Sequence, residues 1–172
     1  MNSSITTMDN VLGNVNGLRS LKDLWGSLRS AVTKTERRSF QLGEELRIEM
    51  QFEEREPEWL VPCLERISRV LSLPENWDTY GGRRVKPLSA IGAFSFLLGV
   101  MQDGTPLPDV SPHRNGTLRL EWHTTKGDLE VEILAPRQYR ISYANARGEI
   151  EVEDLLTRDS SLAIEPLMEV AG

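Results

Sequence analysis

The chain has 172 residues, of which 39% are hydrophobic and 27% charged, and its formal net charge is −6. This length and composition are typical of one soluble globular domain and exclude a wholly disordered chain. The acidic balance argues against nucleic-acid binding by the free protein, which needs a basic face. The single cysteine, Cys63, excludes an internal disulfide and favours a reducing, cytoplasmic location. No apolar run approaches the length of about 20 residues that crosses a bilayer.

The N-terminal part of the chain divides into a tail and an extension. Residues 1–16 are polar and rich in asparagine, which predicts a disordered tail. Residues 17–57 are expected to form an extension that starts with an amphipathic helix and continues with a strand over the alternating residues 45–53. The apolar stripe of that helix can dock on the chain's own core, on a second copy or on another protein. Its candidate partner-binding residues are Leu21, Trp25 and Leu28.

Two helices are predicted in a core domain that we place at residues 58–156. Residues 58–72 are amphipathic, and Cys63 lies near their apolar side as a small buried hydrophobe. Residues 87–101 carry no charge and are apolar in nearly every direction, which predicts a central, buried helix. The proline-rich segment that follows is expected to be an extended connector.

The rest of the core predicts an antiparallel meander. Apolar residues alternate over 117–124, 129–133, 139–143 and 150–152, and short turn sequences separate these segments. We therefore predict an α+β fold: an antiparallel meander sheet of three to five strands packed by two helices, with an extra N-terminal amphipathic helix. Residues 157–172 are expected to be an acidic C-terminal tail.

The loop between the two core helices concentrates residues that adopt special conformations. An Asn-x-Asp pair can accept hydrogen bonds from nearby backbone N–H groups, two aromatic rings can fix the loop on the core, and glycine can adopt a positive φ. An architectural lock is the favoured interpretation, and a binding site is the alternative. The motif residues are Asn76, Trp77, Asp78, Tyr80 and Gly81.

Basic residues after this loop define a candidate contact for an anion or a nucleic acid, although a solvated charge run is the commoner explanation of such a pattern. They are Arg83, Arg84 and Lys86, joined by Arg114 from a later loop.

Catalytic signals are weak. The sequence contains no nucleophile motif, phosphate-binding loop or dinucleotide glycine pattern. The enzymatic alternative is a hydrolase that uses Asp78 with His113 or His123. Two histidines without a spaced set of cysteine or carboxylate ligands predict no metal site, and no cofactor is expected.

The loop and the segments after it resemble a family of small uncharacterised bacterial proteins. The resemblance covers residues 70–150 and leaves residues 1–57 outside it. It implies a bacterial origin and no established activity, so it transfers no catalytic residue. The matching residues are Leu73, Pro74, Asn76, Trp77, Asp78, Tyr80, Gly81, Pro87, Pro108, Pro112, Gly116, Leu118, Leu120, Glu121 and Trp122.

These observations favour a non-enzymatic protein-interaction module, such as a bacterial accessory, antitoxin-like or defence-system subunit. Its partner is expected to be a protein encoded nearby, and no membrane association is expected. The hypothesis depends on the missing catalytic pattern, on a basic start and an acidic end of the chain, and on the extension outside the family-like core. A homodimer, the hydrolase, and a nucleic-acid-contacting subunit of a larger complex remain alternatives.

Overall fold

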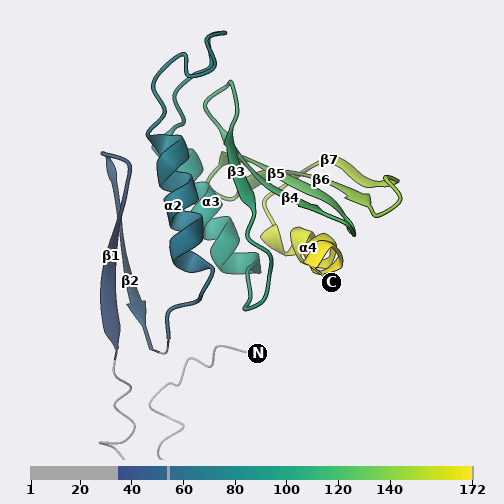
Figure 1. The fold of residues 1–172 in the computed structure, drawn as a ribbon, viewed down its shortest axis with the longest axis horizontal. Helices are drawn as coiled ribbons and strands as arrows, with labels where there is room; N and C mark the ends of the chain where they lie inside the picture. Colours follow the sequence, from purple (N-terminus) through teal and green to yellow (C-terminus); the bar gives the residue numbers. More distant parts are fainter. Residues whose placement is uncertain (1–34, 54, 172) are drawn as a thin grey trace, which may run out of the picture. The chain divides into compact units, whose positions relative to one another are not determined.

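The computed structural model describes residues 35–53 and 55–171 (Figure 1). The chain divides into two units, Met1–Glu36 with Phe52–Glu54, and Arg37–Gln51 with Arg55–Gly172. The tail at 1–16 and the helix predicted over 17–34, with its stripe residues, lie outside the described residues. The elements in chain order are β1 (Glu36–Leu42), β2 (Leu46–Phe52), α2 (Leu60–Leu71), α3 (Pro87–Val100), β3 (Asp109–Pro112), β4 (Leu118–Thr124), β5 (Gly127–Ala135), β6 (Gln138–Asn145), β7 (Ile150–Thr157), η3 (Ser160–Ala163) and α4 (Ile164–Ala171).

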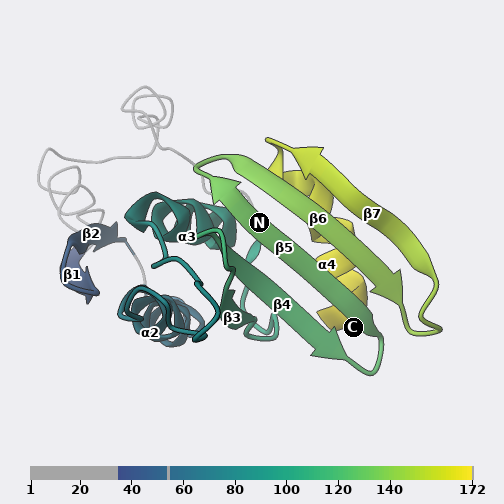
Figure 2. The same ribbon diagram turned by 90° about the horizontal axis from the view of Figure 1, so that it is seen from above.

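The predicted α+β class and the antiparallel meander are both confirmed. Strands β3 to β7 form one sheet in the order β3-β4-β5-β6-β7, with every neighbouring pair antiparallel (Figure 2). The strand predicted over 45–53 is β2, which pairs with β1 in a separate two-stranded sheet. The proline-rich connector begins with a turn, and its last part is extended and forms the edge strand β3.

One face of the five-stranded sheet forms the core. Alternate residues of β4, β5 and β6 point into it, because successive side chains of a strand point to opposite faces. Helix α3 contacts this sheet, and its Phe96 ring meets the Tyr139 ring edge-on at a centroid distance of 5.0 Å. The buried strand residues are Leu118, Leu120, Trp122, Leu129, Val131, Ile133, Tyr139, Ile141 and Tyr143.

Helix α3 is not buried on all sides, so the expectation from its uncharged sequence is wrong in this respect. Its small residues select the face that meets the sheet: a Cβ atom on Gly92 would lie only 2.7 Å from Ile133 Cγ2. The opposite side keeps Leu88, Ile91 and Leu98 exposed, at 60%, 37% and 49% of their surface. The helix approaches the sheet closely at Gly92, a feature that a count of apolar residues does not register.

The C-terminal segment folds onto the sheet, although the sequence suggested an acidic tail. Helix α4 buries Leu167 and Val170 against β4, β5 and β6. The Tyr143 hydroxyl donates a 2.5 Å hydrogen bond to Glu169, and this bond, with burial of the ring, raises the pKa of Tyr143 to about 12. The acidic side chains of α4 obscure this short apolar pattern in the sequence.

Candidate functional site

The motif loop is held together by hydrogen bonds from its backbone N–H groups to two of its own side chains. Asp78 Oδ1 accepts hydrogen bonds from the N–H groups of Tyr80 and Gly82, both at 2.8 Å, and Asn76 Oδ1 accepts one from Gly81 at 2.7 Å. Gly81 has a φ of 86°, in the positive region that the sequence predicts. A carboxylate that accepts backbone N–H bonds is stabilised in its charged form, and the bond from Gly82 is the largest cause of the lowered pKa of Asp78.

The loop is closed at its end by Trp77 and Gly82. The Trp77 indole N–H donates to the carbonyl oxygen of Arg83 at 3.2 Å. A Cβ atom on Gly82 would lie 2.8 Å from the indole nitrogen and 2.9 Å from Asp78 Oδ1. The loop can fold back this tightly only because residue 82 has no side chain.

A second loop, which we call the 113–117 turn, lies against the motif loop. The Arg114 guanidinium donates to Asp78 Oδ2 at 2.8 Å and lies 5.6 Å from the centroid of the Tyr80 ring. Two backbone bonds join the same segments, from Arg83 N to the Arg114 carbonyl and from Lys86 N to the Gly116 carbonyl, both at 3.0 Å. Both oxygens of Asp78 are therefore engaged within the protein.

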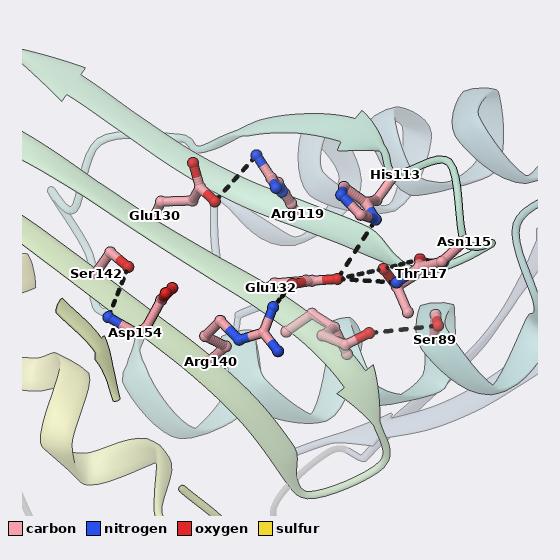
Figure 3. A network of polar contacts seen from close by, with 11 residues as sticks. Ser89, His113, Asn115, Thr117, Arg119, Glu130, Glu132, Arg140, Ser142 and Asp154 are labelled. Carbon is pink, nitrogen blue, oxygen red and sulfur yellow. Dashed lines mark hydrogen bonds and ion pairs between the residues drawn. The ribbon is translucent and has the colours of Figure 1, made fainter. Parts of the chain in front are cut away.

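The other side of the 113–117 turn faces Glu132, a carboxylate on the sheet face away from the helices (Figure 3). Glu132 is 1% exposed. Its Oε1 accepts from the Thr117 hydroxyl at 2.8 Å and from the Asn115 amide at 3.3 Å, and its Oε2 accepts from Arg140 at 2.8 Å. His113 Nδ1 lies 3.6 Å from Oε1.

Glu132 is stabilised in its charged form despite its burial. Burial alone raises the pKa of the carboxyl group, but the bonds from Thr117 and Asn115 and the electrostatic interactions with His113 and Arg140 outweigh it, so the pKa lies below its usual 4.5. We call Glu132 and these four partners the Glu132 cluster.

The 113–117 turn lies between the motif loop and the Glu132 cluster, and its successive side chains face the two sides in turn. His113, Asn115 and Thr117 face Glu132, while Arg114 faces the motif loop and Gly116 faces the segment 83–86 that directly follows it. Gly116 has a φ of 84°, and a Cβ atom there would lie 2.9 Å from the carbonyl oxygen of Arg84. One short turn thus holds the motif loop on one side and the buried carboxylate on the other.

The catalytic pairs that the sequence suggested are not formed. Neither histidine is a hydrogen-bond partner of Asp78 in the described part of the chain: His113 faces Glu132, and His123 Nδ1 lies 2.8 Å from Asp128 Oδ1. The hydrogen bond to Asp128 raises the pKa of His123. Burial of Cys63 raises the pKa of its thiol to about 11 and keeps it protonated near neutral pH.

Among residues 35–53 and 55–171, no group of three or more histidine, cysteine, aspartate or glutamate side chains is arranged to hold a metal ion. Glu121, which shares a strand face with His123, instead accepts a 2.8 Å hydrogen bond from the Ser111 hydroxyl.

The four basic residues of the candidate anion contact are all exposed, and they come from the two loops that the backbone bonds hold together. Two of them have acidic partners: Arg114 pairs with Asp78, and Arg84 lies 3.8 Å from Glu45. Arg83 and Lys86 have no acidic partner among the described residues.

Comparison with protein-family models, with curated proteins and with solved structures found no match to this chain. The structure has no helix, in the parts it describes, that is long and apolar enough to span a membrane.

Proposed function

We propose that this protein is a non-enzymatic protein-interaction module. The observation that carries the proposal is the exposed apolar side of α3, where Leu88, Ile91 and Leu98 lie 37–60% exposed on a helix without any charge. The spacing of these residues places them on one side of the helix. Aliphatic side chains grouped in this way on a soluble domain are typical of a surface that another chain covers.

The polar groups support the same proposal. Asp78 is engaged by its own loop and by Arg114, Glu132 by its cluster, and His123 by Asp128. A general acid or base must reach a proton of the substrate, and groups committed to internal bonds are poorly suited to that role. The strongest charges therefore stabilise loops, and the exposed aliphatic side chains remain available to a partner.

The N-terminal stripe is the second surface in this proposal, because Leu21, Trp25 and Leu28 have helical spacing in the sequence. The resemblance to small bacterial proteins favours an accessory, antitoxin-like or defence-system subunit in the cytoplasm, with its partner encoded nearby. Association through two apolar surfaces needs no cofactor.

Substitution in the full-length chain tests the proposal. Affinity capture with the wild-type chain identifies the partner, and calorimetry with that purified partner then measures affinity. We expect Leu88→Ser with Leu98→Ser to weaken binding by about tenfold or more, since each leucine would no longer bury its surface. Leu21→Ser with Trp25→Ser should have an effect of the same size. The free energy of unfolding should change little for the α3 variant, because both leucines are exposed.

A matched control replaces two exposed apolar residues elsewhere, Leu107→Ser with Met168→Ser. This control should bind like the wild type. If the α3 variant and the N-terminal variant both keep the full affinity for the partner, the interaction module is the wrong function. It is also wrong if the chain hydrolyses a substrate in a reaction that Asp78→Asn abolishes.

A second candidate function is contact with single-stranded nucleic acid within a complex. It is favoured by the position of Tyr80, which is 79% exposed beside Arg114 and next to the loop that carries Arg83 and Lys86. An exposed ring with flanking cations can stack a base and bind its phosphates. The acidic partners of Arg84 and Arg114 reduce the local positive charge, so this candidate ranks below the first.

Its test is fluorescence anisotropy with an oligonucleotide of about 12 bases. If the basic loop binds phosphates, affinity should fall between about 50 and about 200 mM salt. The variant Arg83→Ala with Lys86→Ala should then reduce the logarithmic salt slope by about 1.4, from about 0.7 per lost phosphate contact. The control is Arg69→Ala with Arg158→Ala, at two exposed arginines elsewhere. Equal losses in both variants would mean that only net charge matters.

A further inference from the structure

Strand β7 is the open edge of the five-stranded sheet. It is the last strand in the sheet order, and within the described ranges its outer side pairs with no other strand. The opposite edge, β3, is only four residues long and contacts α2, whereas β7 has eight residues and none of them is buried. An open edge strand offers a row of backbone donors and acceptors to an incoming strand.

The two halves of β7 differ. The first half contains irregular pairing, since Val152 pairs with Tyr143 and Leu155 with Ile141, which leaves an additional residue on β7. In this bulge Asp154 has a φ of 48°, and its N–H donates to the Ser142 hydroxyl at 3.2 Å (Figure 3). The second half, Leu155 to Thr157, pairs in unbroken register with β6.

The exposed side chains of β7 include acidic residues and large aliphatic residues, of which Ile150, 65% exposed, begins the strand. Three acidic residues, Glu151, Glu153 and Asp154, lie around the bulge. Two adjacent leucines follow, and because neighbouring residues of a strand point to opposite faces, Leu155 and Leu156 are exposed on both faces of the edge, at 38% and 58%.

Charges and bulges at an edge often serve only to prevent aggregation. That explanation fits the first half of β7 and does not fit the second, where the register is regular and both side chains are leucines. An edge that merely avoids association would carry a charge there as well. The combination indicates an edge that admits some strands and rejects others.

We propose that β7 binds an extended, basic segment of a partner protein as an additional strand of the sheet. Backbone hydrogen bonds would form along the edge, apolar side chains of the segment would cover Leu155 and Leu156, and its lysine or arginine side chains would face the acidic residues. The same acidic residues reach the sheet face beside β7, since Glu153 and Asp154 help to line a groove of about 330 Å³ there, where the other carboxylates, Asp128 and Glu130, pair with His123 and Arg119.

A second copy of the chain is a poorer occupant of the same edge. Two β7 strands paired antiparallel about their midpoint would place Glu153 of each copy opposite Asp154 of the other, and like charges on neighbouring strands are destabilising. A basic segment relieves this repulsion. The edge is also a different surface from the exposed side of α3, so the two can be tested separately.

Three synthetic peptides probe the edge of the full-length protein, each eight residues long to match β7. One repeats Lys-Lys-Val-Val, so that each face of the strand carries both kinds of side chain, one repeats Glu-Glu-Val-Val, and one is the lysine peptide with a central proline in place of a valine. We expect the lysine–valine peptide to bind and to shift the amide NMR signals of Ile150–Thr157. The glutamate peptide should not bind, and the proline peptide should bind about tenfold more weakly, because proline lacks an N–H and breaks the ladder.

Two substitutions on β7 complete the test. Glu153→Lys and Leu156→Ser should each weaken binding of the lysine–valine peptide, by up to about fivefold. The matched controls, Glu65→Lys on α2 and Leu107→Ser, change exposed residues of the same kinds elsewhere and should bind like the wild type. Equal binding of the proline and unbroken peptides would overturn the proposal in favour of simple charge attraction. A wild-type dimer that Leu156→Ser converts to a monomer would overturn it in favour of self-association.

Discussion

Replacing Glu132 with alanine should lower the free energy of unfolding by about 3 kcal/mol, the low end of the range for removing one member of a buried ion pair. The carboxylate is 1% exposed and holds Thr117, Asn115 and Arg140 by hydrogen bonds. Its removal leaves a cavity and several donors without an acceptor. Because Arg140 is 44% exposed, water can hydrate its guanidinium once the carboxylate is gone, so the loss of stability should stay at the low end of that range. Urea denaturation followed by circular dichroism measures the change.

The control for this variant lies on the same strand and the same face. Glu130 is 38% exposed and pairs with Arg119 at 3.0 Å, so Glu130→Ala removes a surface ion pair and should change the free energy of unfolding by less than about 1 kcal/mol. Similar losses for both variants would show that the Glu132 cluster is no more stabilising than the surface around it.

The same carboxylate makes stability depend on pH. Because the pKa of Glu132 is lower in the folded protein than its usual 4.5, its contribution is present above that value and is lost as pH falls through the folded pKa. The difference in unfolding free energy between wild type and Glu132→Gln should therefore be largest near neutral pH and should shrink below about pH 4. A difference that stays constant through the acid range would mean that the charge of Glu132 does not stabilise the fold.

The fold was largely predictable because its pattern is local. Each strand of the meander alternates within itself and is followed by a short turn, so the period-two signal and the hairpin spacing both appear in consecutive residues. The Asx turn around Asn76 and Asp78 was predictable for the same reason, since its bonds join residues at most five positions apart. Features of this kind need no knowledge of distant contacts.

The missed features depend on partners far along the chain. Strand β1 is an exception: its partner β2 follows almost directly in the sequence, but β1 begins with charged residues and shows no alternation of its own, so the pairing gives little sequence signal. Glu132 lies on the face of β5 that points away from the core, and the sequence alone does not distinguish it from Glu130 on the same face. What distinguishes them is the 113–117 turn, which covers only Glu132 and is 15 residues away at Thr117. The available signal was weak: Arg140 lies directly opposite Glu132 in the hairpin register.

These distant contacts also explain why the motif residues suggest a site. A loop with paired polar residues, aromatic rings and glycines has the same composition whether it binds a ligand or locks the fold. Here the hydrogen bonds of Asp78 end on Tyr80, Gly82 and Arg114. The matching residues of the family-like pattern include Gly116, which lies against the segment 83–86 that directly follows this loop. The motif is therefore best understood as one half of a lock whose other half is the 113–117 turn.

Gly116→Ala tests that lock and should lower the free energy of unfolding by about 2–3 kcal/mol. Alanine at a φ of 84° is strained by about 1–2 kcal/mol. In addition, its Cβ atom would lie 2.9 Å from the Arg84 carbonyl oxygen, a backbone atom that cannot move alone because Arg83 N and Lys86 N bind the turn on either side. Gly104→Ala is the matched control: its φ is 86°, but no heavy atom lies within 4 Å of the new Cβ atom, so it should show only the strain.

The location of the NMR shifts caused by Gly116→Ala shows whether the turn connects the motif loop with the Glu132 cluster. If Gly116 is the point where they meet, alanine there should shift the amide NMR signals of Tyr80 and Gly82, which bind Asp78, together with that of Glu132 on the other side of the turn. Gly104→Ala should leave all three signals in place. Shifts confined to the motif loop would mean that the Glu132 cluster holds the turn without help from Asp78, and the two sites would then be independent features of one surface.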